Sequence, residues 1–149
     1  MDKSRRLMLR TFAVVLALPA GATLAATRTL EVWKDPNCGC CSDWITHLEA
    51  NGFRVEVNDK GNNAAWARLG IPAALGSCHT AEVGGYAIEG HVPAADIKRL
   101  LVEKPNAIGL AVPGMPIGSP GMEQGGRRDA YDVLLVLKGG GTCVFQTHR

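Results

Sequence analysis

A run of cysteines between a strand pattern and a helix pattern constrains the fold of this sequence more than any other feature. Residues 29–33 alternate in the manner of a strand and end at a cluster of turn-forming residues. Apolar residues then recur at helical spacing over 40–50, and Asn51-Gly52 supplies a stop signal. A second alternating run, 53–57, follows a helix of the right length for a right-handed parallel crossover. The cysteines within 38–41 are therefore predicted to lie at the strand-to-helix turn of a βαβ unit.

The next part of the chain adds further predicted elements in a recognisable order. Residues 62–69 are predicted to form a short helix, because apolar side chains lie on one side and a glycine closes the segment. Two strand-like runs, 78–83 and 86–89, flank a two-glycine turn, which is a strong hairpin signal. A helix with an apolar stripe follows within 93–105 and is bounded by prolines. The order βαβ, short helix, ββα is that of an α/β thioredoxin-like domain, which we predict over residues 27–104.

After this predicted domain the composition shifts towards glycine and proline. Ten of the 22 residues over 105–126 are glycine or proline, which predicts an irregular extension rather than a further packed element. Two copies of one tripeptide, Pro113-Gly114-Met115 and Pro120-Gly121-Met122, stand in this extension. A second hairpin is predicted over 132–146, around three glycines. We therefore expect residues 105–149 to form a metal-site extension that ends in a β-hairpin.

Residues 1–26 have the order of a signal peptide, with basic residues, an apolar stretch and a run of small residues. The apolar stretch is shorter than the roughly 20 residues that a membrane-spanning helix needs, so we expect removal of the segment and no membrane anchor. Arg5-Arg6 after Ser4 resembles the twin-arginine export signal. An ordinary secretory signal that happens to hold two arginines is the alternative. Either signal implies a periplasmic protein.

Charge and composition exclude nucleic acid as a partner. The chain has a formal net charge of +2, but residues 1–26 hold four basic residues and one acidic residue, so the remainder is near −1. A near-neutral chain in which 5% of residues are aromatic lacks the basic charge and the aromatic content that nucleic-acid binding uses. The roughly 125 residues after the signal suit one domain that buries its own core, and we expect a monomer.

The cysteine cluster carries the candidate chemistry. Cys38 and Cys41 have the C-x-x-C spacing of a redox dithiol, and the helix N-terminus predicted there stabilises a thiolate. Two-electron exchange needs only two sulfur atoms, whereas three thiolates that converge on one point are what a soft metal ion requires. Cys40 therefore favours a metal site. A metal-free dithiol and a structural disulfide remain the alternatives.

The identity of the metal depends on the other ligands. A closed zinc site needs a fourth ligand, for which the candidates are Cys78, His79 and His91. Copper has better candidates, because thioether sulfur is a ligand for Cu(I) and both Met115 and Met122 stand in the extension. Gap filling in a core is the alternative for the two methionines. The sequence thus favours copper over zinc.

The adjacency of Cys78 and His79 limits what both residues can do. Neighbouring side chains on a strand point to opposite faces, so only one of the two is expected to reach a given site readily. A small buried apolar residue, or a disulfide partner for Cys143, is the alternative for Cys78. His91, near a strand end, is either a ligand or a loop residue. Cys143 itself receives no role.

The cysteines, histidines and methionines belong to longer motifs that keep one order over about residues 30–145. These motifs are Cys38-Gly39-Cys40-Cys41, Ser77-Cys78-His79-Thr80-Ala81, Gly84-Gly85-Tyr86, Ile88-Glu89-Gly90-His91-Val92-Pro93, Gly109-Leu110-Ala111-Val112-Pro113-Gly114-Met115-Pro116 and Gly118-Ser119-Pro120-Gly121-Met122-Glu123. Together they resemble the CopG-type copper-resistance family. Several long motifs in one order are far more specific than a C-x-C-C motif alone.

The resemblance implies a periplasmic thioredoxin-like domain with a C-terminal extension that helps to bind copper. It also implies copper ions bridged by cysteine sulfur, with Cys38, Cys40 and Cys41 as thiolates and Met115 and Met122 in the extension that closes over them. The implied role is interconversion of Cu(I) and Cu(II) ahead of efflux, which makes copper ions and copper-efflux components the expected partners. The two hypotheses are therefore a copper-binding redox protein and a metal-free thiol–disulfide oxidoreductase that uses Cys38 and Cys41.

Overall fold

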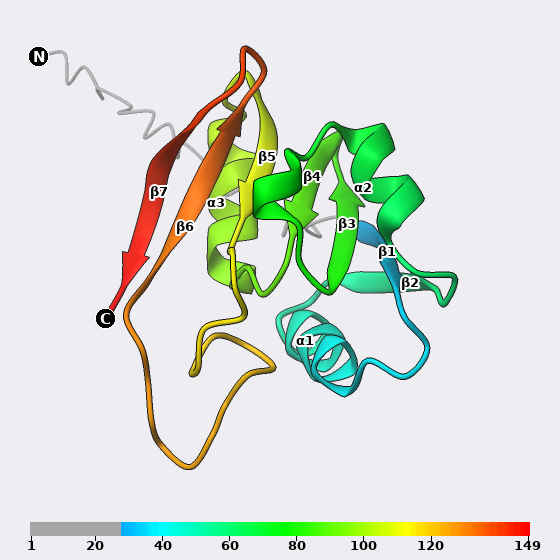
Figure 1. The fold of residues 1–149 in the computed structure, drawn as a ribbon, viewed down its shortest axis with the longest axis vertical. Helices are drawn as coiled ribbons and strands as arrows, with labels where there is room; N and C mark the ends of the chain where they lie inside the picture. Colours follow the sequence, from blue (N-terminus) through cyan, green and yellow to red (C-terminus); the bar gives the residue numbers. More distant parts are fainter. Residues whose placement is uncertain (1–27) are drawn as a thin grey trace, which may run out of the picture.

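A mixed sheet runs through the computed structural model, which describes residues 28–149 (Figure 1). The strands are β1 (Thr29–Lys34), β2 (Arg54–Asn58), β3 (His79–Val83), β4 (Tyr86–Glu89), β5 (Ala107–Ala111), β6 (Tyr131–Leu137) and β7 (Thr142–His148). The helices are α1 (Gly39–Ala50), α2 (Asn63–Leu69) and α3 (Ala94–Glu103), with a 3-10 turn at Ala73–Leu75. All seven strands belong to one sheet in the order β2-β1-β3-β4-β5-β6-β7.

The predicted βαβ unit and the predicted first hairpin are both confirmed. β1 and β2 are parallel neighbours, with Leu30 opposite Val55, and α1 connects them. β3 and β4 are antiparallel partners joined by Gly84 and Gly85, both of which have positive φ. Positive φ at both central residues is what a type I′ turn requires, and this turn matches the twist of a hairpin. The protein therefore has the mixed α/β class that the sequence predicts.

Helices cover both faces of the sheet. The core on one face joins Val32 of β1 to Trp44 of α1 and Leu100 of α3, so α1 and α3 share this face. Trp33 follows Val32 on β1, and its side chain therefore points to the opposite face. There the Arg68 guanidinium of α2 lies 5.0 Å from the centre of the Trp33 ring. Both faces of β1 are thus covered.

One end of the sheet collects the residues that the sequence singles out. Lys34, the last residue of β1, pairs with His79, the first residue of β3. Cys38 follows the end of β1, and Cys78 precedes the start of β3. His91 follows the end of β4, and β5 runs parallel to β4, so the extension also leaves the sheet at this end. The topology therefore brings these segments together.

One prediction about the extension is wrong. Residues 107–111, which the glycine and proline content placed in an irregular segment, form β5 between β4 and β6. All of its residues except the half-buried Ile108 are buried, so tertiary burial overrides local composition. Gly109 is required inside this strand, because a Cβ there would collide with the backbone of Ala87 on β4.

The predicted C-terminal hairpin is confirmed, since β6 and β7 are antiparallel partners at one edge of the sheet. Strands from both sides of residue 104 belong to the same sheet. The division into residues 27–104 and 105–149 stays a prediction. The predicted signal peptide, 1–26, lies outside the described residues. Within 28–149, no helix combines the length and the apolar character needed to span a bilayer.

Candidate metal centre

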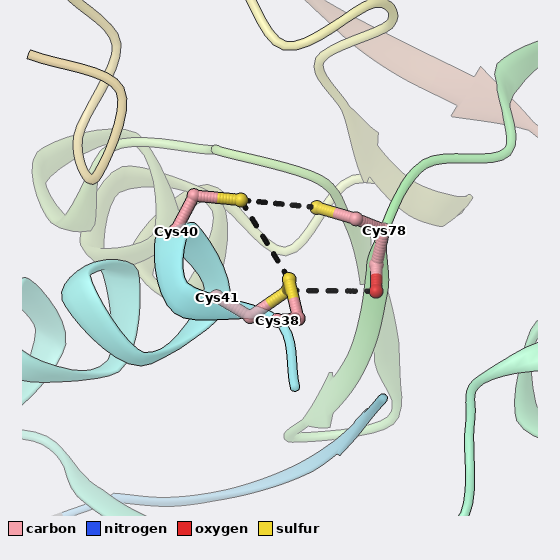
Figure 2. A group of neighbouring side chains, drawn as sticks. All are labelled: Cys38, Cys40, Cys41 and Cys78. Atoms are coloured by element: carbon pink, nitrogen blue, oxygen red, sulfur yellow. Dashed lines mark hydrogen bonds between the residues drawn. A yellow bond between two sulfur atoms is a disulfide. The ribbon is translucent and has the colours of Figure 1, made fainter. Parts of the chain in front are cut away.

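The cysteine motif occupies the first turn of α1. Cys38 is the N-cap residue, and its carbonyl oxygen accepts a hydrogen bond from the Ser42 backbone N–H at 3.4 Å. Cys38 and Cys41 form a disulfide across this turn (Figure 2). Cys41 is buried, whereas Cys40 is half-buried. When the disulfide is reduced, the partial positive charge of the helix N-terminus stabilises thiolates at these positions.

Two free thiols lie beside this disulfide. Cys40 Sγ is 3.6 Å from Cys38 Sγ and 4.0 Å from Cys78 Sγ, and Figure 2 shows the sulfur atoms of Cys40, on α1, and Cys78, before β3, pointing toward each other. Cys41 Sγ lies 3.5 Å from the Cys78 carbonyl oxygen. The four sulfur atoms all lie within 4.8 Å of one another. The structure therefore brings the three cysteines of the motif together with Cys78.

A second group of donor atoms shares Cys78. Its sulfur lies 3.4 Å from Nδ1 of His79 and 3.4 Å from Nε2 of His91, and the three donor atoms are within 4.8 Å of one another. The expectation that only one of Cys78 and His79 reaches this site is wrong. Cys78 lies in a bend before β3 begins, so the alternation of a strand does not apply to it. Both residues face the same site.

Backbone carbonyl groups orient the two histidine rings. His79 Nε2 lies 3.0 Å from the Gly90 carbonyl oxygen, and His91 Nδ1 lies 2.8 Å from the Pro120 carbonyl oxygen. A carbonyl oxygen only accepts hydrogen bonds, so each of these nitrogens is assigned the ring proton. The other nitrogen of each neutral ring, which faces Cys78, then has its lone pair available for a metal ion.

Burial favours the uncharged forms of the groups in this site. It lowers the pKa of His79 to about 3, and the neighbouring His91 lowers it further. Burial also lowers the pKa of His91. It raises the pKa of Cys78 to about 11, with the nearby Cys40 as the second cause. The histidines are therefore neutral at neutral pH, as metal ligands must be, whereas a metal ion that binds Cys78 has to displace a proton.

The second Pro-Gly-Met copy packs on the first turn of α1. Pro120 supplies the carbonyl oxygen that holds His91. A Cβ added to Gly121 would lie 2.7 Å from both the Cys40 carbonyl oxygen and the Trp44 backbone nitrogen. The extension therefore lies in direct contact with the cysteine helix, and Met122 is the next residue along the chain.

The first Pro-Gly-Met copy is more open. Nothing lies within 4 Å of a Cβ added to Gly114, and Met115 is 42% exposed. Of the two predicted methionine ligands, the structure thus places Met122 next to a segment that contacts α1 and leaves Met115 exposed. The repeated tripeptide does not reveal this difference, because the two copies are identical in sequence.

A buried carboxyl group behind the start of β3 escaped the sequence analysis. Glu89 is fully buried and accepts hydrogen bonds from the Ser77 backbone N–H and from the Thr80 hydroxyl group. The Asn62 amide donates to the Ser77 carbonyl oxygen at 3.0 Å and to the Thr80 hydroxyl oxygen at 3.2 Å. Burial raises the pKa of Glu89 to about 7, even though the hydrogen bonds from Thr80 and Ser77 lower this pKa. The signal that could have found this network is a single acid in the apolar run of β4.

Cys143 lies apart from the candidate site. It is an exposed free cysteine on β7, at the edge of the sheet. The alternative that pairs Cys78 with Cys143 in a disulfide is therefore wrong for this structure, in which Cys78 has a free thiol beside Cys40. The distance along the sheet explains the outcome, since β4, β5 and β6 lie between β3, which Cys78 directly precedes, and β7, which carries Cys143.

Comparisons with known proteins give similar chains over most of this length. A family model described as a protein of unknown function, DUF411, matches residues 75–122. A solved structure described as copper resistance protein CopG, form 2, is 49% identical, with a TM-score of 0.78; the match covers 83% of this chain and 99% of the other. Form 1 of the same protein is 50% identical, with a TM-score of 0.76, and the match covers 80% and 96%. The search of curated proteins found no match.

Substitution of the two tripeptide glycines tests the contact between the extension and α1. Both Gly114 and Gly121 have positive φ, so alanine carries a backbone cost of roughly 1–2 kcal/mol at either position. Only at Gly121 does the new Cβ also meet the backbone of α1. We expect Gly121→Ala to lower the free energy of unfolding by about 1–3 kcal/mol more than Gly114→Ala, measured by chemical denaturation. Equal losses in the two variants would contradict the contact.

Proposed function

Because this chain belongs to the CopG copper-resistance family, we propose that it binds copper through the sulfur atoms of Cys38, Cys40, Cys41 and Cys78. The observation that carries this proposal is the convergence of the four sulfur atoms within 4.8 Å at one end of the sheet. Thiolates are soft ligands and favour Cu(I). Reduction of the Cys38–Cys41 disulfide makes all four sulfur atoms available to the metal.

The histidines and methionines extend the proposed donor set beyond one ion. Four thiolates alone also suit zinc or an iron–sulfur cluster, whereas imidazole and thioether ligands together with thiolates suit copper. The Cys78 sulfur belongs to two donor groups, one with the other three cysteines and one with His79 and His91. One sulfur atom in two donor groups supports copper ions bridged by cysteine sulfur. Met122 and Met115 are the proposed thioether ligands, and Met115 is the more exposed of the two.

The sulfur atoms are also the proposed source of electrons for bound copper. Reduced Cys38 and Cys41 together lose two protons and two electrons when their disulfide closes, and two Cu(II) ions each gain one electron to become Cu(I). An external dithiol that reduces the disulfide restores the starting state. The Cys38–Cys41 disulfide supports this proposal, because it is the oxidised product of the step. In this account the chain reduces Cu(II) to Cu(I), which is one direction of the proposed interconversion of Cu(I) and Cu(II), and acts as a copper oxidoreductase.

The same proposal includes a thioredoxin-like domain over residues 27–104 and a metal-site extension over 105–149. Its support is the strand order β2-β1-β3-β4, in which β1 and β2 are parallel and β3 is antiparallel to both of its neighbours. The C-x-x-C disulfide at the start of α1 supports it as well. We propose that the protein is a monomer and that it passes copper to efflux components.

A metal-free thiol–disulfide oxidoreductase is the second candidate, and the Cys38–Cys41 disulfide favours it too. In that reaction Cys38 attacks a substrate disulfide and Cys41 resolves the mixed disulfide. Neither Cys40 nor Cys78 has a part in this chemistry. Cys40 therefore separates the two candidates.

Copper retention after a single substitution separates them in practice. We expect the reduced chain, loaded with Cu(I) without oxygen and freed of unbound metal, to retain several copper ions by elemental analysis. Cys40→Ser should lose most of them, because a hydroxyl group is a poor ligand for Cu(I). Cys143→Ser is the matched control, since Cys143 is exposed on β7, and it should retain as much copper as the unchanged chain. Failure of the unchanged chain to retain copper would favour the metal-free oxidoreductase.

The yield of Cu(I) tests the proposed electron source. Reduced chain mixed with excess Cu(II), in the presence of a chelator that absorbs light only with Cu(I), should produce at least two Cu(I) per chain. Cys38→Ser cannot close the Cys38–Cys41 disulfide, so its yield should be lower by about two Cu(I) per chain. An equal yield from both proteins would show that electrons do not come from this pair.

We propose that the signal in residues 1–26 directs export of the folded chain through the twin-arginine route. The support is Arg5-Arg6 after Ser4, followed by an apolar stretch too short to span a membrane. With the twin-arginine route blocked, we expect the chain to stay in the cytoplasm at full length in cell fractionation. Normal periplasmic export under that block would favour an ordinary secretory signal.

A further inference from the structure

The two thiols left beside the Cys38–Cys41 disulfide lie close enough to form a pair of their own. Cys40 Sγ and Cys78 Sγ are 4.0 Å apart, whereas a disulfide needs a sulfur–sulfur distance of about 2.05 Å. An approach of about 2 Å is within reach of side-chain rotation. Cys40 is half-buried, and Cys78 lies in a bend outside the strand ladder. The two sulfur atoms can therefore approach each other directly.

The other sulfur atoms near Cys40 belong to the Cys38–Cys41 disulfide, and pairing of Cys40 with either of them does not change the oxidation state of the site. Cys40 Sγ lies 3.6 Å from Cys38 Sγ, which already belongs to the disulfide. Attack there would only exchange one disulfide for another and would release Cys41 as a thiol. While the Cys38–Cys41 disulfide stays in place, the Cys40–Cys78 pair is the one that can add a second disulfide at this site.

We propose that Cys40 and Cys78 close a second disulfide when the site is fully oxidised. The two thiols lose two protons and two electrons, and two Cu(II) ions take one electron each to become Cu(I). This step rests on the proposed function in that Cu(II) is the natural oxidant. A dithiol reductant reverses the step, with the dithiol itself becoming a disulfide.

The consequence is a site whose affinity for copper depends on its own oxidation state. After the first disulfide, Cys40 and Cys78 remain as thiols, and the Cys78 sulfur lies next to nitrogen atoms of His79 and His91. After the second, every sulfur atom in this group is part of a disulfide, and thiolate is the form that binds metal. The doubly oxidised chain therefore loses its thiolate ligands and releases Cu(I).

A count of free thiols tests the second disulfide directly. The Cys143→Ser variant removes the exposed cysteine on β7 and leaves only the four cysteines of the site. After reduction, treatment with excess Cu(II) and removal of copper, we expect the free thiols of the unfolded variant to fall from four to zero. Two remaining thiols would overturn the proposal. The same count after diamide, an oxidant that is not a metal, is expected to give zero as well.

Peptide mapping locates the new bond and excludes further oxidation of single sulfur atoms. Trypsin separates the three clustered cysteines, in peptide 35–54, from Cys78, in peptide 69–98. We expect the oxidised variant to join these peptides, with a mass loss of two hydrogens for each disulfide. Separate peptides, or a gain of oxygen at Cys78, would contradict the proposal. The Cys40→Ser, Cys143→Ser double variant is the control: it should keep one free thiol and leave the two peptides separate.

These outcomes keep the second disulfide apart from the proposed function. If the reduced chain binds copper and yields Cu(I) while two thiols survive both oxidants, the second disulfide is wrong and the copper function stands. If diamide closes both disulfides in a chain that retains no copper, the copper function is wrong and the Cys40–Cys78 pair stands.

Discussion

Trp44 is the side chain on which the geometry of the candidate metal centre depends. It is fully buried in the core, its indole N–H donates to the Val92 carbonyl oxygen at 2.9 Å, and its ring centre lies 4.2 Å from that of His79. It thus ties α1, which carries the C-x-C-C motif, to the chain segments that carry Cys78 and the histidines. Because a close-packed interior resists small displacements, the cysteine helix keeps a fixed position relative to the ends of β3 and β4.

The titratable thiol of Cys78, the redox-active cysteines and the extension all lie at the start of α1 and β3. A metal ion that binds Cys78 has to displace the thiol proton, since burial raises the pKa of that thiol, while His79 is already neutral. The carbonyl oxygen that orients His91 comes from Pro120, and the next residue, Gly121, rests on the first turn of α1. Any change at the sulfur atoms therefore takes place next to the segment that bears Met122, so the proposed copper chemistry and the position of the extension would be linked.

Local patterns predicted most of the fold because its elements follow their own periodicity. The alternation in β1, the apolar stripe of α3 and the two-glycine turn at Gly84-Gly85 each depend on neighbouring residues alone. β5 was missed because its burial depends on β4 and β6, whose positions the glycine and proline content does not reveal. Likewise, the motif predicted a cysteine cluster, but the placement of Cys78 beside Cys40 and of Glu89 behind Ser77 required the tertiary structure.

The central claim is that the reduced chain holds copper through sulfur at the start of α1 and β3, and copper K-edge X-ray absorption tests it most directly. Measured on the reduced chain loaded with copper, the account predicts a Cu(I) edge and a first coordination shell dominated by sulfur. A first shell made up of nitrogen and oxygen alone would contradict the account, because it would place the copper away from the four converging cysteines.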